Sequence, residues 1–271
     1  MSTVNTLGTA LITGASTGIG ATYADRLGRR GYNLILVARN KPKLEAVAKT
    51  LTTQTGVRVT VLPADLTAGE ELHRVERVLR EDPNITLLVN NAGIATLGAF
   101  ANADIERLDR DIRLNVVAPT RLSHAALAAF LARNRGGIIN IASVMSQMVQ
   151  PGNSVYGGAK AYLLYFSEVL ALEAGTSAVR VQAVLPGATG TALWDGSGVE
   201  LKDLPPEIVM DVGEMVDAAL AGFDQGERIT VPSLPDAGDW QRLLKAREDL
   251  QPNLSHRHSA PRYKIALAAT G

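Results

Sequence analysis

The chain has no cysteine among its 271 residues. This absence excludes disulfide bonds, metal sites built on thiolates and cysteine nucleophiles. Long apolar stretches are missing too, since no run approaches the ~18 residues that a membrane-spanning helix needs. The first residues, MSTVNTLGTALITG, lack the basic and then apolar order of a secretory signal. We therefore expect a cytoplasmic protein with no membrane partner.

An excess of charge of one sign is also absent. Lysine plus arginine and aspartate plus glutamate each number 27, so the formal net charge is zero. Such a chain has no global positive field that would attract a polyanion. The charge balance therefore gives no support for a nucleic-acid partner and leaves a small molecule as the expected ligand.

Short apolar segments rich in β-branched residues alternate with longer segments of helical length. The expected strands are residues 9–13, 33–38, 57–64, 85–90, 137–142, 179–186 and 228–232. The expected helices are residues 18–30, 41–54, 68–82, 104–133 and 154–174. The strands are continuous apolar runs, as is typical of strands covered on both faces. This order predicts an α/β fold of the Rossmann type, a doubly wound, seven-stranded parallel sheet with helices on both faces.

We expect a single domain over residues 1–271, with its core at 8–232. Residues 192–223 begin with a stretch rich in glycine and proline that is too long for a simple crossover, which suggests a lid. Residues 233–271 are expected to form a C-terminal helix and a tail that is loosely ordered or docked on a partner subunit.

A glycine-rich turn, TGASTGIG, joins the first strand to the first helix. Gly14, Gly18 and Gly20 allow a tight turn and a close approach of the backbone to a ligand, while the helix N-terminus favours an anion. The turn therefore indicates a nucleotide phosphate site. Arg39 follows the second strand, where sites that prefer NAD usually carry an acid. Because a guanidinium pairs with a 2′-phosphate, we expect NADP(H) to be favoured over NAD(H).

Tyr156 and Lys160 lie four residues apart at the start of a predicted helix, in NSVYGGAKAY. Residues at this spacing share a helix face, so the phenol and the ammonium can meet. Gly157 and Gly158, which destabilise a helix relative to alanine, suggest that something packs close to this backbone.

Six motifs in order make the chain resemble the short-chain dehydrogenases/reductases from residue 8 to about 232. They are TGASTGIG, ADL (64–66), NNAG (90–93), Ser143, Tyr156-x3-Lys160 and PGATGT (186–191). The resemblance implies that the NADP(H) cofactor contacts Gly14, Ser16, Thr17, Gly18, Ile19, Gly20, Arg39, Asp65, Leu66, Asn90, Asn91, Ala92, Gly93, Tyr156, Lys160, Pro186, Gly187, Thr189 and Thr191.

The resemblance also implies a catalytic set of four residues, Asn115, Ser143, Tyr156 and Lys160. Tyr156 would be the general acid or base and Ser143 would hold the substrate oxygen. Lys160 would favour the phenolate and bind the nicotinamide ribose. Pro119 has no N–H and so leaves the carbonyl of Asn115, four residues earlier, without its helical partner. The resemblance implies that this carbonyl holds a water; the alternative is a kinked helix without that role.

The substrate side is less well defined by the sequence. The expected wall residues are Ser143, Met145, Ser146, Met148, Val149 and Trp194, in the loop before Tyr156 and in the lid. The alternative is that these side chains only pack the loop. His256 and His258 have chelating spacing but no third ligand nearby, so no metal is expected. Extra apolar positions in residues 104–133 and 154–174 suggest a homo-oligomer, a dimer or a tetramer.

The sequence therefore predicts an oxidoreductase that transfers a hydride between NADP(H) and a carbonyl or secondary alcohol. Three alternatives remain open: a non-catalytic sensor or scaffold that binds NAD(P), an alcohol dehydrogenase that prefers NAD, and related chemistry such as enoyl reduction or epimerisation.

Overall fold

The computed structural model describes residues 7–195 and 197–263. The contacts divide the chain into two compact units, Met1–Pro232 and Ser233–Gly271, which are described separately. The expected core of residues 8–232 falls within the first unit. Residues 1–6, 196 and 264–271, which the domain and tail predictions include, lie outside the described residues.

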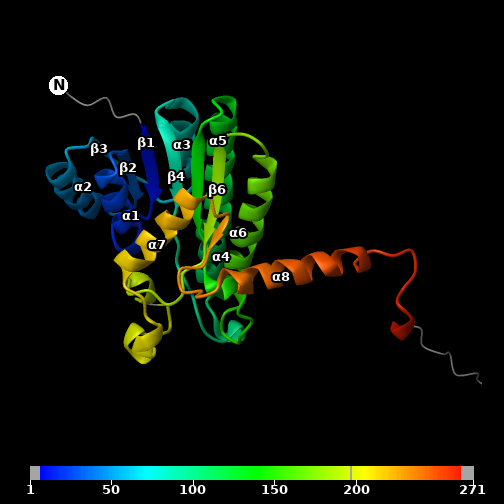
Figure 1. Ribbon diagram of the computed structural model, residues 1–271. Coiled ribbons are helices and arrows are strands. Elements are labelled where there is room, and N and C mark those ends of the chain that lie inside the picture. Colours follow the sequence, from blue (N-terminus) through cyan, green and yellow to red (C-terminus); the bar gives the residue numbers. More distant parts are fainter. Residues whose placement is uncertain (1–6, 196, 264–271) are drawn as a thin grey trace, which may run out of the picture. The chain divides into compact units, whose positions relative to one another are not determined.

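The first unit is built on one parallel sheet of seven strands among the described residues (Figure 1). The strands are β1 (Thr9–Thr13), β2 (Asn33–Ala38), β3 (Val59–Pro63), β4 (Ile85–Asn90), β5 (Gly136–Ile141), β6 (Val179–Val184) and β7 (Ile229–Thr230). Their spatial order, β3-β2-β1-β4-β5-β6-β7, confirms the doubly wound prediction. The order reverses between β1 and β4, and the carboxyl ends of strands at such a point are where open sheets of this kind bind ligands.

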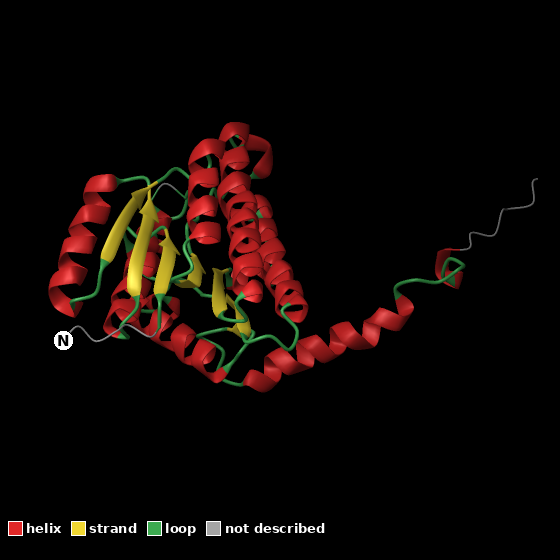
Figure 2. Cartoon of the chain, turned by 90° about the horizontal axis from the view of Figure 1, so that it is seen from above, coloured by secondary structure: helices red, strands yellow, loops and turns green. Residues whose placement is uncertain are grey.

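Helices cover both faces of this sheet (Figure 2). Their bounds are α1 (Gly18–Arg29), α2 (Lys41–Thr55), α3 (Gly69–Glu81), α4 (Ile105–Ile112), α5 (Ala118–Ala132), α6 (Ser154–Glu173) and α7 (Val212–Gln225). Buried side chains of α1, α2 and α7 pack on one face, and those of α3, α5 and α6 on the other. Because both faces are covered, the strands carry the continuous apolar runs that identified them in the sequence.

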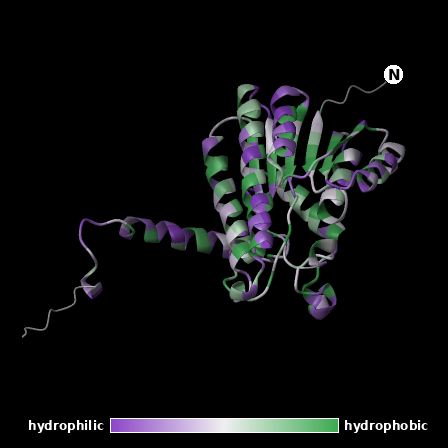
Figure 3. Cartoon of the chain, turned by 180° about the vertical axis from the view of Figure 1, so that it is seen from behind, coloured by the Kyte–Doolittle hydropathy of each residue, from purple (hydrophilic) through white to green (hydrophobic). Residues whose placement is uncertain are grey.

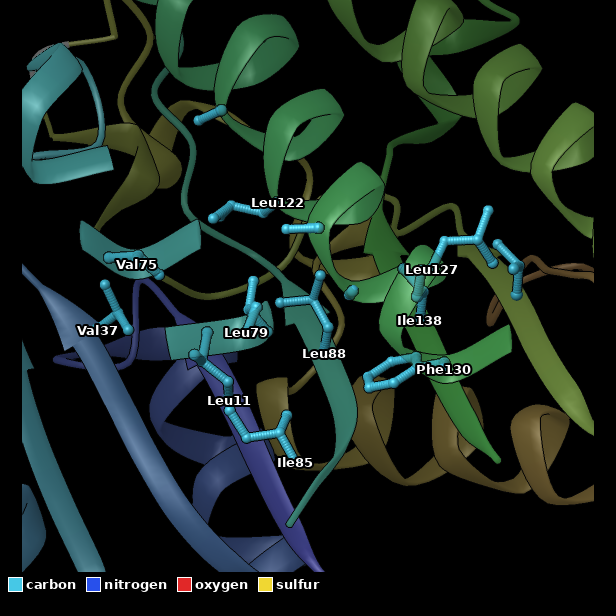
Figure 4. Close-up of a cluster of buried hydrophobic side chains, with 14 of the residues drawn as sticks. Leu11, Val37, Val75, Leu79, Ile85, Leu88, Leu122, Leu127, Phe130 and Ile138 are labelled. Carbon is cyan, nitrogen blue, oxygen red and sulfur yellow. The ribbon is translucent and has the colours of Figure 1, made fainter. Parts of the chain in front are cut away.

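One of the two hydrophobic clusters lies between the sheet and α3 and α5 (Figure 4). Leu11 and Leu88 project from β1 and β4 toward Leu79 of α3 and Leu122 of α5. Each of these side chains is at most 1% exposed. Full burial of one such side chain contributes about 1.5–3 kcal/mol. This cluster fixes the strands whose carboxyl ends carry the site.

The helical segment expected over 104–133 is present from Ile105 to Ala132, but it is not one regular α-helix. The segment comprises α4, a π-helical turn η2 (Arg113–Val117) and α5. The N–H of Ala118 bonds to the carbonyl of Arg113, five residues back. Pro119, which cannot donate a hydrogen bond, lies in the first turn of α5. The role expected for the Asn115 backbone carbonyl, holding a water, stays a prediction.

The lid expected over 192–223 is wrong in its second half. α7 begins at Val212, and its Met215, Val216 and Ala219 are fully buried in the core. A helix that packs on the sheet with this face cannot leave it without exposing the core. The seventh strand is also shorter than the expected 228–232, since β7 pairs with β6 over two residues.

The outer helices mix polar and apolar residues along their length (Figure 3). Exposed large apolar side chains occur on α4 and α6, including Ile105, Ile112, Tyr165 and Leu172. They are compatible with the subunit contact expected for these helices, which stays a prediction. In the part of the chain that the structure describes, we find no helix with the length and hydropathy to cross a membrane.

The second unit contains α8 (Ala237–Leu250), which Asp236 caps by accepting the N–H of Gly238. No described residue of this helix is buried. The helix itself confirms the C-terminal helix expected after residue 232.

Candidate active site

The glycine-rich turn runs from the end of β1 into α1 and closes on itself. A Cβ on Gly20 would lie 2.3 Å from the carbonyl oxygen of Gly14, whose own φ is +66°. Neither position can therefore carry a side chain. Thr17 precedes α1 without a side-chain cap, and the first turn of α1 holds no acid. The N–H groups of this turn are thus available to an anion.

A cleft of about 520 Å³ lies beside this helix N-terminus. Its lining includes Thr17 and Gly18 of the turn and Thr191 after β6. The glycine-rich turn and the segment after β6, which the sequence assigned to the same cofactor, therefore line the same cleft. The four expected catalytic residues are not among the residues that line this cleft.

Two further predicted cofactor residues follow β2 and β3. Arg39 is exposed directly after β2. Asp65, after β3, accepts hydrogen bonds from the N–H of Thr67 at 2.9 Å and from its hydroxyl at 2.7 Å. Burial alone would raise the pKa of Asp65, but the bonds from Thr67 and the charge of Arg39 hold it below its usual value. Leu66 is buried beside it.

The NNAG segment follows β4 and is fixed to β1. The Asn91 side chain donates to the carbonyl of Thr13 at 2.9 Å, and the Ala92 N–H donates to the Thr13 hydroxyl at 3.0 Å. Asn90 is buried within the sheet and donates to Ser123 of α5 and to Asn140 of β5, at 2.9 and 2.8 Å. Its side chain therefore ties the sheet to a helix, and its expected contact with the cofactor stays a prediction.

Tyr156 and Lys160 are both buried, at 8% and 5% exposure, on the same face of α6. The Lys160 Nζ lies 5.5 Å from the centre of the Tyr156 ring and donates to the carbonyl of Ile141 at 2.8 Å. Ser143, 7% exposed, has its hydroxyl near enough to the Tyr156 phenol to lower the pKa of that phenol. The Ser143 hydroxyl also accepts the N–H of Met145 at 3.1 Å. The structure thus brings a hydroxyl, a phenol and an amine together at the carboxyl ends of β5 and β6.

Burial shifts both titrating groups. It raises the pKa of Tyr156 to about 12, against the opposing hydrogen bond from Ser143, while the charge of Asp111 adds to the rise. It lowers the pKa of Lys160 to about 8. The salt bridges found among the described residues include none with Lys160. The phenol is therefore held in its protonated form, and the lysine is buried with no acidic partner among the described residues.

Asn115, 1% exposed, completes this group from η2. Its side-chain amide donates to the carbonyls of Ile94 and Asp111, at 2.8 and 2.9 Å, and its Oδ1 has no partner among the described residues. A Cβ on Gly93 would lie 2.8 Å from that Oδ1 and 3.6 Å from the Lys160 Nζ. The glycine of the NNAG segment is therefore required by the neighbouring site residues.

The glycines between Tyr156 and Lys160 differ in their surroundings. A Cβ on Gly157 would lie 2.5 Å from the amide nitrogen of Asn153, whereas one on Gly158 would meet nothing within 4 Å. The close neighbour that the sequence suggested is therefore another protein side chain, and it concerns Gly157 alone. Asn153 is buried and went unnoticed in the sequence.

The segment after β6 holds the remaining cofactor candidates. Pro186 is buried and its carbonyl lies 3.4 Å from the Ser143 hydroxyl. The Thr189 hydroxyl donates to the carbonyl of Gly187, and the Thr189 carbonyl accepts the indole N–H of Trp194 at 2.9 Å. Trp194 is thus bonded to this segment.

The expected substrate wall is only partly enclosed. Met145 and Ser146 are half-buried in the short turn after Ser143. Met148 is 49% exposed and Val149 is fully exposed, so neither side chain encloses a pocket in this structure. Their contact with a substrate stays a prediction.

One buried acid was missed in the sequence. Asp111, on α4, is 1% exposed and lies one helical turn before Asn115. The available signal was its spacing, because Leu108, Asp111 and Asn115 fall on one helical face. Among the described residues, no three histidine, cysteine, aspartate or glutamate side chains gather in a way that could hold a metal ion.

Comparison with known proteins places this site in a family. The short chain dehydrogenase family model matches residues 8–200. Among solved structures, a short-chain dehydrogenase from Sphingobium yanoikuyae in complex with NADPH is 46% identical, with a TM-score of 0.92, and covers 95% of this chain and 100% of that one. A bulky-bulky ketone specific alcohol dehydrogenase from Comamonas testosteroni is 45% identical, with a TM-score of 0.88, and covers 96% and 99%.

The first curated relatives are longer proteins. The human inactive hydroxysteroid dehydrogenase-like protein 1 is 31% identical over 186 residues, which is 68% of this chain and 56% of the relative. The chain spans less than two thirds of the length of the first such relatives. The family model nevertheless covers most of the chain, and the fold is that of the matched short-chain dehydrogenase structures. The chain belongs to the short-chain dehydrogenase family.

Proposed function

We propose that this protein is an oxidoreductase that transfers a hydride between NADP(H) and a carbonyl or secondary alcohol group. The observation that carries the proposal is the buried group of Ser143, Tyr156 and Lys160, which sets a protonated phenol beside a hydroxyl and an amine. This is an acid–base group with a partner for an oxygen atom, at the end of the sheet where ligands bind.

The residues present fit a dinucleotide. The uncapped N-terminus of α1 offers N–H groups to a pyrophosphate, and the cleft beside Gly18 and Thr191 offers space. The buried Oδ1 of Asn115, which has no partner among the described residues, is a further polar atom beside Lys160 and Gly93. When bound, the nicotinamide supplies or accepts the hydride.

The chain's own residues would handle the proton and the oxygen. Tyr156 would donate its proton to the carbonyl oxygen in reduction, because its phenol is protonated over the whole physiological range. Ser143 would hold the same oxygen through its hydroxyl. Lys160, with a pKa near neutrality, would return a proton toward Tyr156.

The proposed substrate is a bulky, apolar ketone or the corresponding alcohol. The 45% identity to a bulky-bulky ketone specific alcohol dehydrogenase supports this class. Met145, half-buried next to Ser143, is a flexible apolar side chain suited to an irregular substrate.

The test is to follow NADPH consumption with a panel of ketones that carry large groups on both sides of the carbonyl, with small aliphatic ketones for comparison. Turnover of the large ketones with faster rates than the small ones is expected. Turnover of small ketones alone would contradict the proposal that the substrate is bulky. If no ketone is turned over and neither NADPH nor NADH binds, the proposal that the protein is an oxidoreductase is wrong.

The preference for NADP(H) rests on Arg39, which lies exposed at the end of β2. Replacing Arg39 with Asp should raise the KM for NADPH by about tenfold or more, because a charge-assisted bond to the 2′-phosphate becomes a repulsion. The KM for NADH should stay constant or fall. Arg77→Asp, an exposed change on α3, is the control. An unchanged NADPH KM in Arg39→Asp would leave an NAD-preferring dehydrogenase as the better assignment.

A second candidate is a protein that binds the dinucleotide without catalysis. It is favoured by the relation to a human protein described as inactive. Against it stands the full set of Asn115, Ser143, Tyr156 and Lys160. Tight NADPH binding without turnover of any carbonyl or alcohol would favour this candidate.

A further inference from the structure

Asp111 places a carboxyl group in the protein interior beside the catalytic candidates. Its Oδ2 accepts the N–H of Thr96 at 2.8 Å, while its Oδ1 is buried without a hydrogen-bond partner among the described residues. Burying a carboxylate with one unsatisfied oxygen is unfavourable. A hydrophobic residue would fill the same helical face at less cost in stability.

The loop that Asp111 binds connects several parts of the site. Four hydrogen bonds fix this loop. The Ile94 carbonyl accepts the Asn115 amide at 2.8 Å, and the Thr96 N–H donates to Asp111. The N–H groups of Leu97 and Gly98 donate to the carbonyls of Ser197 and Gly152, at 2.7 and 2.9 Å. Only the contact of Thr96 is made by a side chain that carries charge. The other contacts depend on the loop being held where it is.

Asp111 also acts on Asn115 directly, because the Asp111 carbonyl accepts the second hydrogen of the Asn115 amide at 2.9 Å. We propose that Asp111 is a positioning residue: its carboxyl group holds residues 94–98 against α4, and thereby fixes Asn115 and the segment that leads into Tyr156. Asn115 therefore has one partner on Asp111 and one on the loop that Asp111 holds.

The charge of Asp111 gives a second readout. The carboxyl group interacts with Arg107 and Arg110 on α4, with Thr96 on the loop and with Tyr156 on α6. Burial raises the pKa of Asp111, while the hydrogen bonds from Thr96 and the positive charges of Arg107 and Arg110 oppose this rise. The ionised form of Asp111 in turn raises the pKa of Tyr156. When Asp111 is ionised, its charge opposes loss of the Tyr156 proton.

The experiment compares Asp111→Asn, which keeps an acceptor for Thr96, with Asp111→Leu, which does not. Asp109→Asn, an exposed residue of α4 paired with Arg113, is the matched control. Hydrogen exchange of the cofactor-free proteins is measured by mass spectrometry over residues 92–98. We expect faster exchange there in Asp111→Leu, and wild-type exchange in Asp111→Asn and Asp109→Asn.

The kinetic readout rests on the proposed function. For Asp111→Asn we expect the pH dependence of kcat/KM for alcohol oxidation to move to lower pH by about one unit, because a negative charge near Tyr156 is removed. For Asp111→Leu we expect kcat to fall at least about tenfold with little change in the KM for NADPH.

Unchanged exchange in a folded Asp111→Leu protein would overturn the proposal. So would an Asp111→Asn enzyme whose pH profile matches that of Asp109→Asn, a result that can be obtained even where Asp111→Leu does not fold. Absence of turnover in the wild type contradicts the proposed function alone, because the exchange measurement does not depend on it.

Discussion

Replacing Tyr156 with phenylalanine is expected to lower kcat for ketone reduction by about 10²–10⁴-fold, the usual contribution of one general acid. The change removes the phenolic oxygen and its bond with Ser143, and it leaves the ring that packs beside Lys160. The affinity for NADPH, measured by quenching of protein fluorescence, should stay within about threefold of the wild type, since the loss concerns the proton and not the main cofactor contacts.

The pH dependence of the same variant provides a sharper check. Burial raises the pKa of Tyr156 to about 12, so the phenol is protonated at every pH used to assay reduction, and oxidation should speed up with pH as the phenolate appears. Phe at this position should abolish that rise. Tyr165→Phe, on the same helix but exposed, is the control and should behave as the wild type. A loss of less than tenfold in Tyr156→Phe would contradict the acid–base assignment.

The sheet could be predicted from the sequence because its strands are buried on both faces. Four of the expected strands, including 9–13 and 85–90, agree with the structure within one residue at each end. β7 was overestimated, since Val231 and Pro232, which follow the two residues that pair with β6, are also apolar. Local hydropathy reports burial, whereas pairing depends on where the neighbouring strand ends.

The helix errors have a related cause. The segment 104–133 is continuously helical in character, and a π turn changes the hydrogen-bond partners without changing the pattern of apolar residues. Residues 212–223 were assigned to a lid because they follow a loop rich in glycine and proline, although Met215 and Val216 have the spacing of a packed helix. Motif order could identify Ser143, Tyr156 and Lys160, but not their partners.

Those partners come from distant segments and carry no local signal. The carbonyl that binds Lys160 belongs to Ile141, and the loop that Asp111 binds lies fifteen residues earlier in the chain. Gly93 reads as part of a cofactor motif, yet the contacts that exclude a side chain there are with Asn115 and Lys160. The sequence thus predicts which residues form the site, whereas the protein contacts that hold them are visible only in the fold.

Replacing Lys160 with methionine is expected to separate stability from activity. In the wild type Lys160 is a buried cation with a single hydrogen bond among the described residues, to the Ile141 carbonyl. Burial lowers its pKa from 10.5 to about 8. Below pH 8 both the folded and the unfolded states carry the proton, and the folded state bears the full desolvation penalty. Between about pH 8 and 10.5 the unfolded state binds the proton and the folded state does not, so the wild-type free energy of unfolding rises with pH through this window.

Methionine carries no charge, so Lys160→Met does not gain stability from this site as the pH rises. Its free energy of unfolding relative to that of the wild type should therefore decline by about 3 kcal/mol between neutral pH and pH 10.5. Urea unfolding of both proteins across this range, with the exposed Lys202→Met as control, measures the difference. The variant should also lose about 10²-fold or more in kcat, because the group that returns the proton to Tyr156 is gone. A relative stability that does not vary with pH would show that Lys160 is not a buried cation in solution. If it does vary while activity is lost, the chain retains an unfavourable buried charge for its chemistry, as expected where a lysine serves proton transfer rather than folding.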